Sequence, residues 1–377
     1  SAGGVKGPAP RESGPGRASS PACTPAGGDL YRQVTGPWID TSRLPDDRSR
    51  YGSFDRLAEQ AESDVRDILE EEDCPAVKSR ALYLSFLDVE AIEKAGDDPI
   101  RPDLEAVDSS ADKDARLEAL GRLNPLGGPD LIDSAVYGDP GDPDVSIVHL
   151  EQGGLGLPDE AYYRDRRYEG IRAAYVRMVG EQLRHAGYDD AEGQASRLLR
   201  VETSIASHHW DNVATRDSKK TYNPVTFDEL SAMLSDIDVD RWISSWQASY
   251  DSSSAATARP LDMKAVLGRV IVHEPSFITG LDAFWRDATL DDLKLWARVH
   301  VLIGWAPMLS SDFDSTNSDF YGRTLSGTKA QRDRWKRAVP LVNSSCREDV
   351  GRAYVRLPFP EDSLPPYREH VSHPNDA

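Results

Sequence analysis

The sequence predicts a mainly α-helical domain that begins at about residue 30. Three observations support this fold class. Apolar residues recur at three- and four-residue spacing in several long segments, as they do along one face of a helix. Helix-start and helix-end signals flank such segments. Strand-like stretches are few, and no internal repeat is visible.

Two segments carry the clearest helical periodicity. The first has its apolar face at Phe54, Leu57, Ala58, Ala61, Val65, Ile68 and Leu69. The second has its apolar face at Ile171, Ala174, Tyr175, Met178 and Leu183. Gly187 follows the second segment where a helix C-cap is expected, because glycine adopts the left-handed conformation that ends many helices.

Capping signals predict the start of two further helices. Thr226 and Glu229 have the spacing of a capping box, in which each side chain bonds to the backbone N–H of the other residue. Thr289 and Asp292 form a weaker version ahead of another apolar segment. The best strand candidates are residues 145–150 and 266–272, and turn-rich segments at 127–141 and 251–260 separate the helices.

The composition excludes several classes of partner. The 377 residues carry a net charge of −20, which disfavours nucleic acids and anionic membranes because both require a basic surface. No apolar run approaches the roughly 18 residues of a membrane span. The three cysteines, Cys23, Cys74 and Cys346, form no C-x-x-C motif, and an odd number allows at most one bridge. We therefore expect a soluble protein with reduced thiols, cytoplasmic rather than secreted.

The stretch VIVHEPSFI, residues 270–278, begins like the zinc-peptidase motif H-E-x-x-H. That motif needs a second histidine four residues after the first, on the same helical face. Phe277 occupies that position, and Pro275 interrupts the segment where the helix should continue. We interpret His273 as the end of a short strand and Pro275 as the start of a turn.

Two other near-motifs are also interpreted as structural. Gly322–Lys329 resembles a phosphate-binding P-loop, but the order of Thr328 and Lys329 is reversed, so a surface turn is favoured. His208 and His209 are adjacent, and neighbouring positions on a helix point about 100° apart, which suits a shared metal poorly. A packed histidine is the favoured interpretation of His209.

A series of short motifs stands in order between residues 29 and 363. The first, Asp29-Leu30-Tyr31 through Gly36-Pro37-Trp38, follows the pattern D-x-Y-x-x-V-N-G-x-W, with Thr35 in place of the usual Asn. The others are Arg50–Asp55, Tyr83–Asp88, Gly154–Asp159 with Tyr162-Tyr163, Arg216-Asp217 with Tyr222-Asn223, Phe320–Gly322, Arg334–Arg337, Leu341–Asn343, Val350-Gly351 with Tyr354-Val355, and Phe359-Pro360. Together they resemble the neprilysin/endothelin-converting-enzyme family of zinc metalloendopeptidases, its actinobacterial members in particular.

The resemblance implies that this chain is the multi-helix N-terminal lobe of a neprilysin-like, two-lobed metallopeptidase. In that family the zinc belongs to the other lobe, with its H-E-x-x-H motif, a downstream Glu ligand and a transition-state His. None of these motifs is present here, so we expect no catalytic residue, metal ligand or cofactor in this chain. The expected domains are a disordered Gly/Pro/Ala/Ser-rich tail at 1–28, the helical domain at 29–363 and an irregular tail outside the family pattern at 364–377.

The resemblance also implies two substrate-binding residues, Arg50 and Asp55. In the family, the Arg and Asp of this motif reach towards the C-terminal end of a bound peptide. A guanidinium binds a carboxylate through two parallel hydrogen bonds, which makes the transfer to Arg50 physically sensible. The alternative is an ion pair at the start of a helix, because Asp55 lies in its first turn.

Three functional hypotheses follow. The chain is the substrate-capping lobe of a zinc endopeptidase that hydrolyses oligopeptides, silent by itself and completed by a catalytic lobe on a longer or separate chain. Alternatively, it is a non-catalytic module that binds peptides or a protein. The third hypothesis is a non-functional remnant with an exposed apolar cavity face, which would aggregate.

Overall fold

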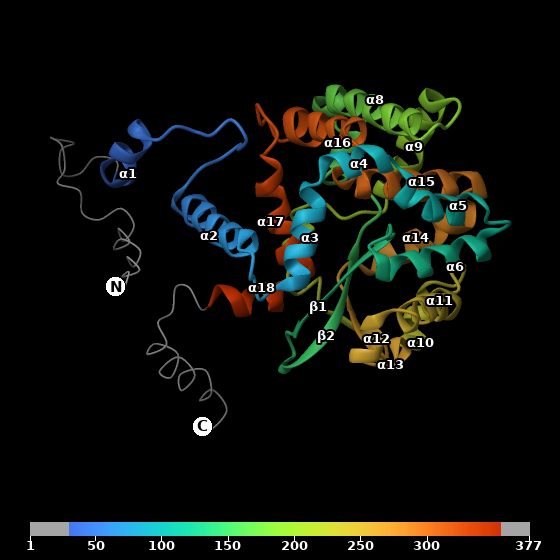
Figure 1. Cartoon of the computed structure of the whole chain (residues 1–377). Coiled ribbons are helices and arrows are strands. Elements are labelled where there is room, and N and C mark those ends of the chain that lie inside the picture. The colour runs from blue at the N-terminus through green and yellow to red at the C-terminus, as the bar shows by residue number, and fades with distance from the viewer. Residues whose placement is uncertain (1–29, 356–377) are drawn as a thin grey trace, which may run out of the picture. The chain divides into compact units, whose positions relative to one another are not determined.

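The computed structural model describes residues 30–355, which are mainly helical as predicted (Figure 1). The chain divides into two compact units. Among the described residues, one unit combines 30–87 with 327–355, and the other runs from Asp88 to Ser326. The expected tails at 1–28 and 364–377, Cys23 and the Phe359-Pro360 motif lie outside the described residues. Within residues 30–355, no helix is both long enough and apolar enough to cross a bilayer.

The first unit is helical throughout its regular structure. Its helices are α1 (Leu30–Thr41), α2 (Ser53–Glu70), α3 (Val77–Leu87), α17 (Arg334–Ser345) and α18 (Arg347–Tyr354). Helices α17 and α18, from the end of the chain, pack against α2 and α3. The Ser79 hydroxyl donates to Asp349 over 2.8 Å, which ties α3 to α18. Both Cys74 and Cys346 are free thiols.

Helix α2 confirms the first predicted helix, but only its second half is buried. Val65, Ile68 and Leu69 are at most 5% exposed. Phe54 and Leu57, on the same apolar face near the helix start, are 85% and 65% exposed. The periodic pattern identified the helix correctly and overestimated how much of it is covered.

The second unit contains more helices around a small sheet. Its α-helices are α4 (Val89–Ala95), α5 (Arg101–Asp108), α6 (Lys113–Leu123), α7 (Ala161–Arg164), α8 (Glu169–His185), α9 (Ala191–Ala206), α10 (Phe227–Met233), α11 (Val239–Asp251), α12 (Ser254–Ala258), α13 (Met263–Val266), α14 (Pro275–Asp287), α15 (Leu290–Trp305) and α16 (Ser311–Ser318). Short 3₁₀ turns lie at Asp98–Ile100, Asn124–Leu126, Arg166–Tyr168, Ala214–Arg216 and Ala306–Met308, and a π-helix, η6, spans Asp319–Leu325. Helix α15 packs against α5, α6, α8 and α9, and its Trp296 is 1% exposed.

The sheet has the order β1-β2-β4-β3. Its strands are β1 (Ile132–Asp139), β2 (Asp142–Gln152), β3 (Asn223–Thr226) and β4 (Arg269–Val272). Strands β1 and β2 form an antiparallel hairpin, β2 pairs with β4 in parallel, and β3 pairs with β4 antiparallel.

The sheet corrects three sequence-based interpretations. Strand β1 lies inside the segment that we expected to form turns. The sequence did not predict this strand, because its largely exposed residues show no alternation of apolar and polar side chains. Strand β4 is shorter than residues 266–272, since α13 occupies Met263–Val266. Pro275 begins helix α14 instead of a turn, and its missing N–H costs nothing at the first helical position.

The predicted caps are confirmed in detail. Thr226 and Thr289 both form complete capping boxes, with Glu229 and Asp292 respectively. Gly187 ends α8 with φ of +79°, and the N–H of Tyr188 donates to the Leu183 carbonyl over 2.9 Å. The P-loop-like segment does not form one simple surface turn, because its first residues, Gly322–Leu325, belong to the π-helix.

A buried carboxylate, Glu202 of α9, joins four helices of the second unit. It is fully buried and accepts hydrogen bonds from Tyr163 of α7 (2.8 Å), Tyr175 of α8 (3.0 Å) and His300 of α15 (2.7 Å). Burying a carboxylate is costly unless donors replace water, and these three side chains do so. The proximity of Glu202 in turn raises the pKa values of both tyrosines, in addition to the larger effect of burial.

The glycine-rich segment after β2 is held beside this cluster by its own carbonyl groups. The carbonyls of Gly153, Gly154 and Gly156 accept from His209, Trp296 and Tyr321, each over 2.9 Å. Gly154 has φ of +83°, which favours glycine. A Cβ at Gly156 would collide with the Tyr175 hydroxyl. Side chains are therefore excluded where the backbone approaches the cluster.

We predict that Glu202→Ala lowers the free energy of unfolding by at least about 3 kcal/mol, because two buried tyrosines and the partly buried His300 lose their acceptor. Urea denaturation followed by circular dichroism measures this change. Glu181→Ala, at an exposed position of α8, is the matched control and should change stability little. Equal stability of the two variants would contradict the role assigned to Glu202.

Candidate functional site

The first candidate site is the start of α2, where the sequence placed Arg50 and Asp55. Asp55 accepts an ion pair from Arg48 (Nη1 to Oδ1, 3.4 Å), and the same guanidinium bonds Glu59 over 2.9 Å. The Tyr51 hydroxyl donates to the other oxygen of Glu59 over 2.8 Å. The structure therefore pairs Asp55 with Arg48, and Arg50 is not its partner.

Arg50 is exposed, and its guanidinium makes no hydrogen bond or ion pair with the described part of the chain. It lies three residues before α2, whose N-cap, Gly52, offers no side-chain bond to the first N–H groups. Helix N-termini carry partial positive charge. Phe54 and Leu57 add exposed apolar surface to the same end of the helix. This end of α2 thus combines a free cation with apolar side chains.

The part played by Arg48 could not have been read from the sequence. Its partners lie seven and eleven residues later, and the loop conformation alone brings them together. The guanidinium of Arg48 is largely covered, with 16% of its side chain exposed. It fixes the conformation of the segment that carries Arg50.

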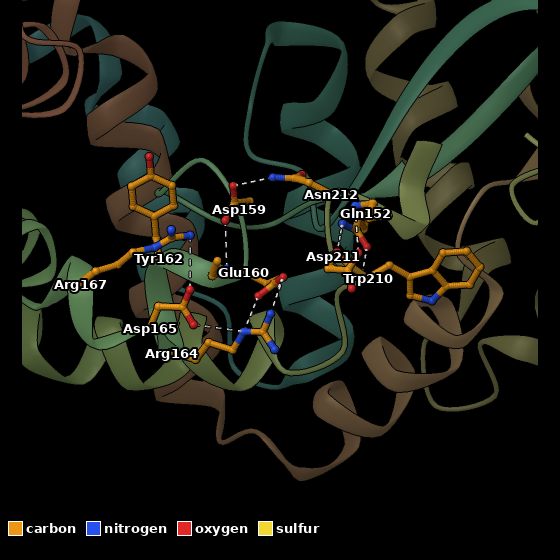
Figure 2. Close-up of polar contacts among 12 residues, drawn as sticks. Gln152, Asp159, Glu160, Tyr162, Arg164, Asp165, Arg167, Trp210, Asp211 and Asn212 are labelled. Atoms are coloured by element: carbon orange, nitrogen blue, oxygen red, sulfur yellow. Dashed lines mark hydrogen bonds and ion pairs between the residues drawn. The ribbon is translucent and has the colours of Figure 1, made fainter. Parts of the chain in front are cut away.

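A second candidate site is a polar cavity of about 640 Å³ in the other unit. Helix α7, the end of α9 and the following loop supply its lining residues, which include Glu160, Arg164, Trp210, Asp211 and Lys220. Figure 2 shows the contacts that shape it. They join Gln152 and Asp159 to residues 210–212, and only Asp159 belongs to one of the motifs recognised in the sequence, Gly154–Asp159.

Hydrogen bonds hold the two sides of this cavity together. The Gln152 side chain exchanges two hydrogen bonds with the backbone of Trp210, over 2.7 and 3.0 Å. Asn212 donates to Asp159 over 2.7 Å, as Figure 2 shows. The loop that follows α9 is thereby attached to the segment that follows β2.

The charges of the cavity are mixed. Glu160 is 6% exposed and pairs with Arg164 over 2.8 Å. Burial raises the pKa of Glu160, while Arg164 opposes this shift. Backbone N–H groups of Ala214 and Val213 lower the pKa of Asp211. Both signs of charge are therefore present at the cavity.

The histidines singled out in the sequence have structural partners. His209 lies against the ring of Phe277, and burial lowers its pKa to about 4, so it is neutral at pH 7. The Nδ1 atom of His149 lies 2.8 Å from Nε2 of His273, which joins the neighbouring strands β2 and β4. His209 is packed as interpreted, but it lies beyond α9, which ends at Ala206, and not on a helix; His273 does follow a strand.

The described residues do not fit a zinc ion. Between residues 30 and 355, no three His, Cys, Asp or Glu side chains lie close enough together to hold a metal. His273 and Glu274 bond to His149 and to the Gln152 N–H respectively. No step of a reaction is therefore assigned to a metal held by these residues.

Sequence comparison identifies the class of protein that contains such a lobe. The profile of the N-terminal region of Peptidase family M13 matches residues 26–373, so the chain belongs to Peptidase family M13. Human neprilysin is 24% identical over 375 residues, which cover 92% of this chain and 48% of that protein. An endothelin-converting enzyme homolog of Locusta migratoria is 23% identical over 364 residues, covering 89% and 48% respectively. These matches confirm the family resemblance seen in the short motifs.

Solved structures agree with this assignment. Zinc metalloprotease ZMP1 of Mycobacterium tuberculosis, in complex with an inhibitor, superposes with a TM-score of 0.77 at 30% identity, covering 92% of this chain and 53% of that one. PepO from Lactobacillus rhamnosis has a TM-score of 0.71 at 20% identity, which supports the fold alone, with 91% and 53% covered. The chain thus spans about half the length of the relatives that it matches.

Glu274, which lies between β4 and α14, is a buried carboxyl group whose titration should affect stability. Burial raises the pKa of Glu274 to about 7, partly offset by the Gln152 N–H. A carboxyl group with a raised folded-state pKa favours the fold when protonated. Its contribution is complete below the unfolded pKa of 4.5 and is lost as pH rises through about 7.

We predict that the stability of the wild type relative to Glu274→Gln falls by about 1–3 kcal/mol between pH 4.5 and pH 8, the lower end allowing for solvent screening. Glutamine keeps a neutral acceptor for the Gln152 N–H. Urea denaturation of both proteins across this range measures the difference. A difference that stays constant with pH would show that Glu274 titrates normally.

Proposed function

We propose that this chain is the substrate-capping N-terminal lobe of a zinc-dependent endopeptidase that acts on oligopeptides. Membership of Peptidase family M13 and the half-length match to zinc metalloproteases support the proposal. The lobe comprises residues 29–363, with the segments 1–28 and 364–377 outside it. Hydrolysis requires a zinc-binding lobe on a longer or separate chain, and the 377 residues alone are inactive.

The observation that carries the proposal is the free guanidinium of Arg50, which precedes by three residues a helix whose first half exposes apolar side chains. A peptide that ends in an apolar residue offers the complementary pair, a terminal carboxylate and an apolar side chain. Arg50 binds the carboxylate through two hydrogen bonds, supported by the partial positive charge at the start of α2. Phe54 and Leu57 contact the apolar side chain.

Asp55 contributes by fixing the approach to Arg50. Its Oδ1 atom faces Arg48 at 3.4 Å, a longer contact than the 2.9 Å between Arg48 and Glu59. Asp55 therefore retains acceptor capacity for an N–H group near the end of the peptide. Arg50 and Asp55 together bind the C-terminal end of the substrate. Arg50 binds its carboxylate, and Asp55 accepts a hydrogen bond from a backbone N–H group.

We predict that Arg50→Ala lowers kcat/KM about 10- to 100-fold for peptides with a free C-terminal carboxylate, the loss of one charge-assisted contact. The enzyme for this test is the native, zinc-containing protein. For the C-amidated form of the same peptide, Arg50→Ala should lower kcat/KM less than about twofold, because the amide has no terminal charge for Arg50 to bind. Arg56→Ala, an exposed arginine of the same helix, is the matched control.

Two outcomes would count against the proposal. An equal loss for the acid and the amide would show that Arg50 does not read the carboxylate. An intact mass near 41.6 kDa with no zinc, for the protein purified from its source, would remove the endopeptidase assignment. Retained binding of the peptide acid in that case would favour the alternative of a peptide-binding module, through the same residues.

A further inference from the structure

The second unit contains an apolar cavity of about 460 Å³ that lies apart from the polar cavity. Its size is within the range of small-molecule sites, about 300–1,000 Å³. Its lining residues come from strands β1 and β2, from helices α10, α11 and α13, and from the segment before α13. The residues that line it are Ser134, Ala135, Val136, Val148, Leu150, Leu230, Trp242, Ile243, Trp246, Arg259, Leu261, Met263, Val266 and Leu267.

The wall on the sheet is explained by the strand register. Val136 lies opposite Val148, and Ser134 lies opposite Leu150 in the antiparallel hairpin. Directly opposed residues point to the same face of a sheet. One face of β1 and β2 therefore lines the cavity, with the exposed residues Ser134 and Val136 on β1 and the buried residues Val148 and Leu150 on β2.

Two tryptophans of α11 are among the helical residues that line the cavity. Trp242 and Trp246 are one helical turn apart, and their ring centroids are separated by 6.0 Å. Both are half-buried, and neither indole N–H donates a hydrogen bond within the described residues. Large flat rings with a spare donor are common where a protein binds an amphiphilic ligand.

Arg259 is the one charged residue among those that line the cavity. It is exposed, and its guanidinium makes no hydrogen bond or ion pair with the described part of the chain. No acidic side chain is among the lining residues, although the whole protein carries a net charge of −20. An unpaired guanidinium where an apolar cavity meets solvent is complementary to a carboxylate with an apolar body.

We propose that this cavity binds a medium-chain fatty acid, with the hydrocarbon chain between the sheet and α11 and the carboxylate on Arg259. The two ends of the ligand match the two parts of the cavity. Burial of the hydrocarbon provides affinity, and the guanidinium fixes the orientation. The site is separate from Arg50 and independent of the peptidase assignment.

Isothermal titration of the 377-residue chain with decanoate tests the proposal directly. We expect saturable binding of one decanoate per chain, and binding of decanol at least about tenfold weaker, because only the acid engages Arg259. Arg259→Ala should weaken decanoate binding by about the same factor and leave decanol unchanged. Arg177→Ala, an exposed arginine of α8 outside the cavity, is the matched control.

A second variant tests the location of the hydrocarbon chain. Ser134→Phe puts a ring into the cavity from an exposed position, so the fold is retained while the space is filled. We expect it to abolish decanoate binding without lowering the melting temperature. Undiminished binding in this variant, or equal affinity for decanoate and decanol, would overturn the proposal. Binding of N-acetyl-leucine as tight as that of decanoate would overturn it as well, by identifying a peptide C-terminus as the occupant.

Discussion

The second unit depends on the burial of one carboxylate, that of Glu202. A buried carboxylate without donors would cost several kcal/mol, so the structure around it must supply them in fixed positions. Tyr163 and Tyr175 do this from α7 and α8, which precede α9 directly in the chain, and His300 does it from α15, about 100 residues later. The same requirement limits the neighbouring backbone, because Gly156 passes so close to Tyr175 that no side chain fits.

The glycine-rich segment, residues 153–156, connects the buried cluster around Glu202 to the protein surface. Its carbonyls are held by His209, Trp296 and Tyr321, and it continues directly into Asp159 and Glu160 at the polar cavity. The cavity therefore has a rigid side, anchored to the buried cluster. Its other side is the loop after α9, attached by Gln152 and Asn212. The motif Gly154–Asp159 thus connects the core of the unit to its surface.

In contrast to the buried Glu202 cluster, the start of α2 in the first unit is exposed. The second half of the helix is buried in the core of the unit, and the first half leaves Phe54 and Leu57 exposed, close in sequence to the unpaired Arg50. Exposed apolar groups next to a free cation cost stability in an isolated lobe and are useful where a peptide binds. Arg48 keeps this arrangement in place through its contacts with Asp55 and Glu59. The stable part of α2 and the binding part that we propose are thus adjacent on one helix.

The amino-acid sequence was sufficient to predict the mainly helical class, the family and the start or end of individual helices. The capping boxes at Thr226 and Thr289 and the C-cap at Gly187 depend on residues within a few positions of each other, so they were predictable. The edge strand β1 was missed because its side chains are exposed and lack the alternation that burial imposes on a strand. Tertiary structure alone decided that Arg48 pairs with Asp55, that Glu202 gathers three donors, and that Arg259 lies at an apolar cavity. Each of these depends on contacts between segments that the chain brings together only when it folds.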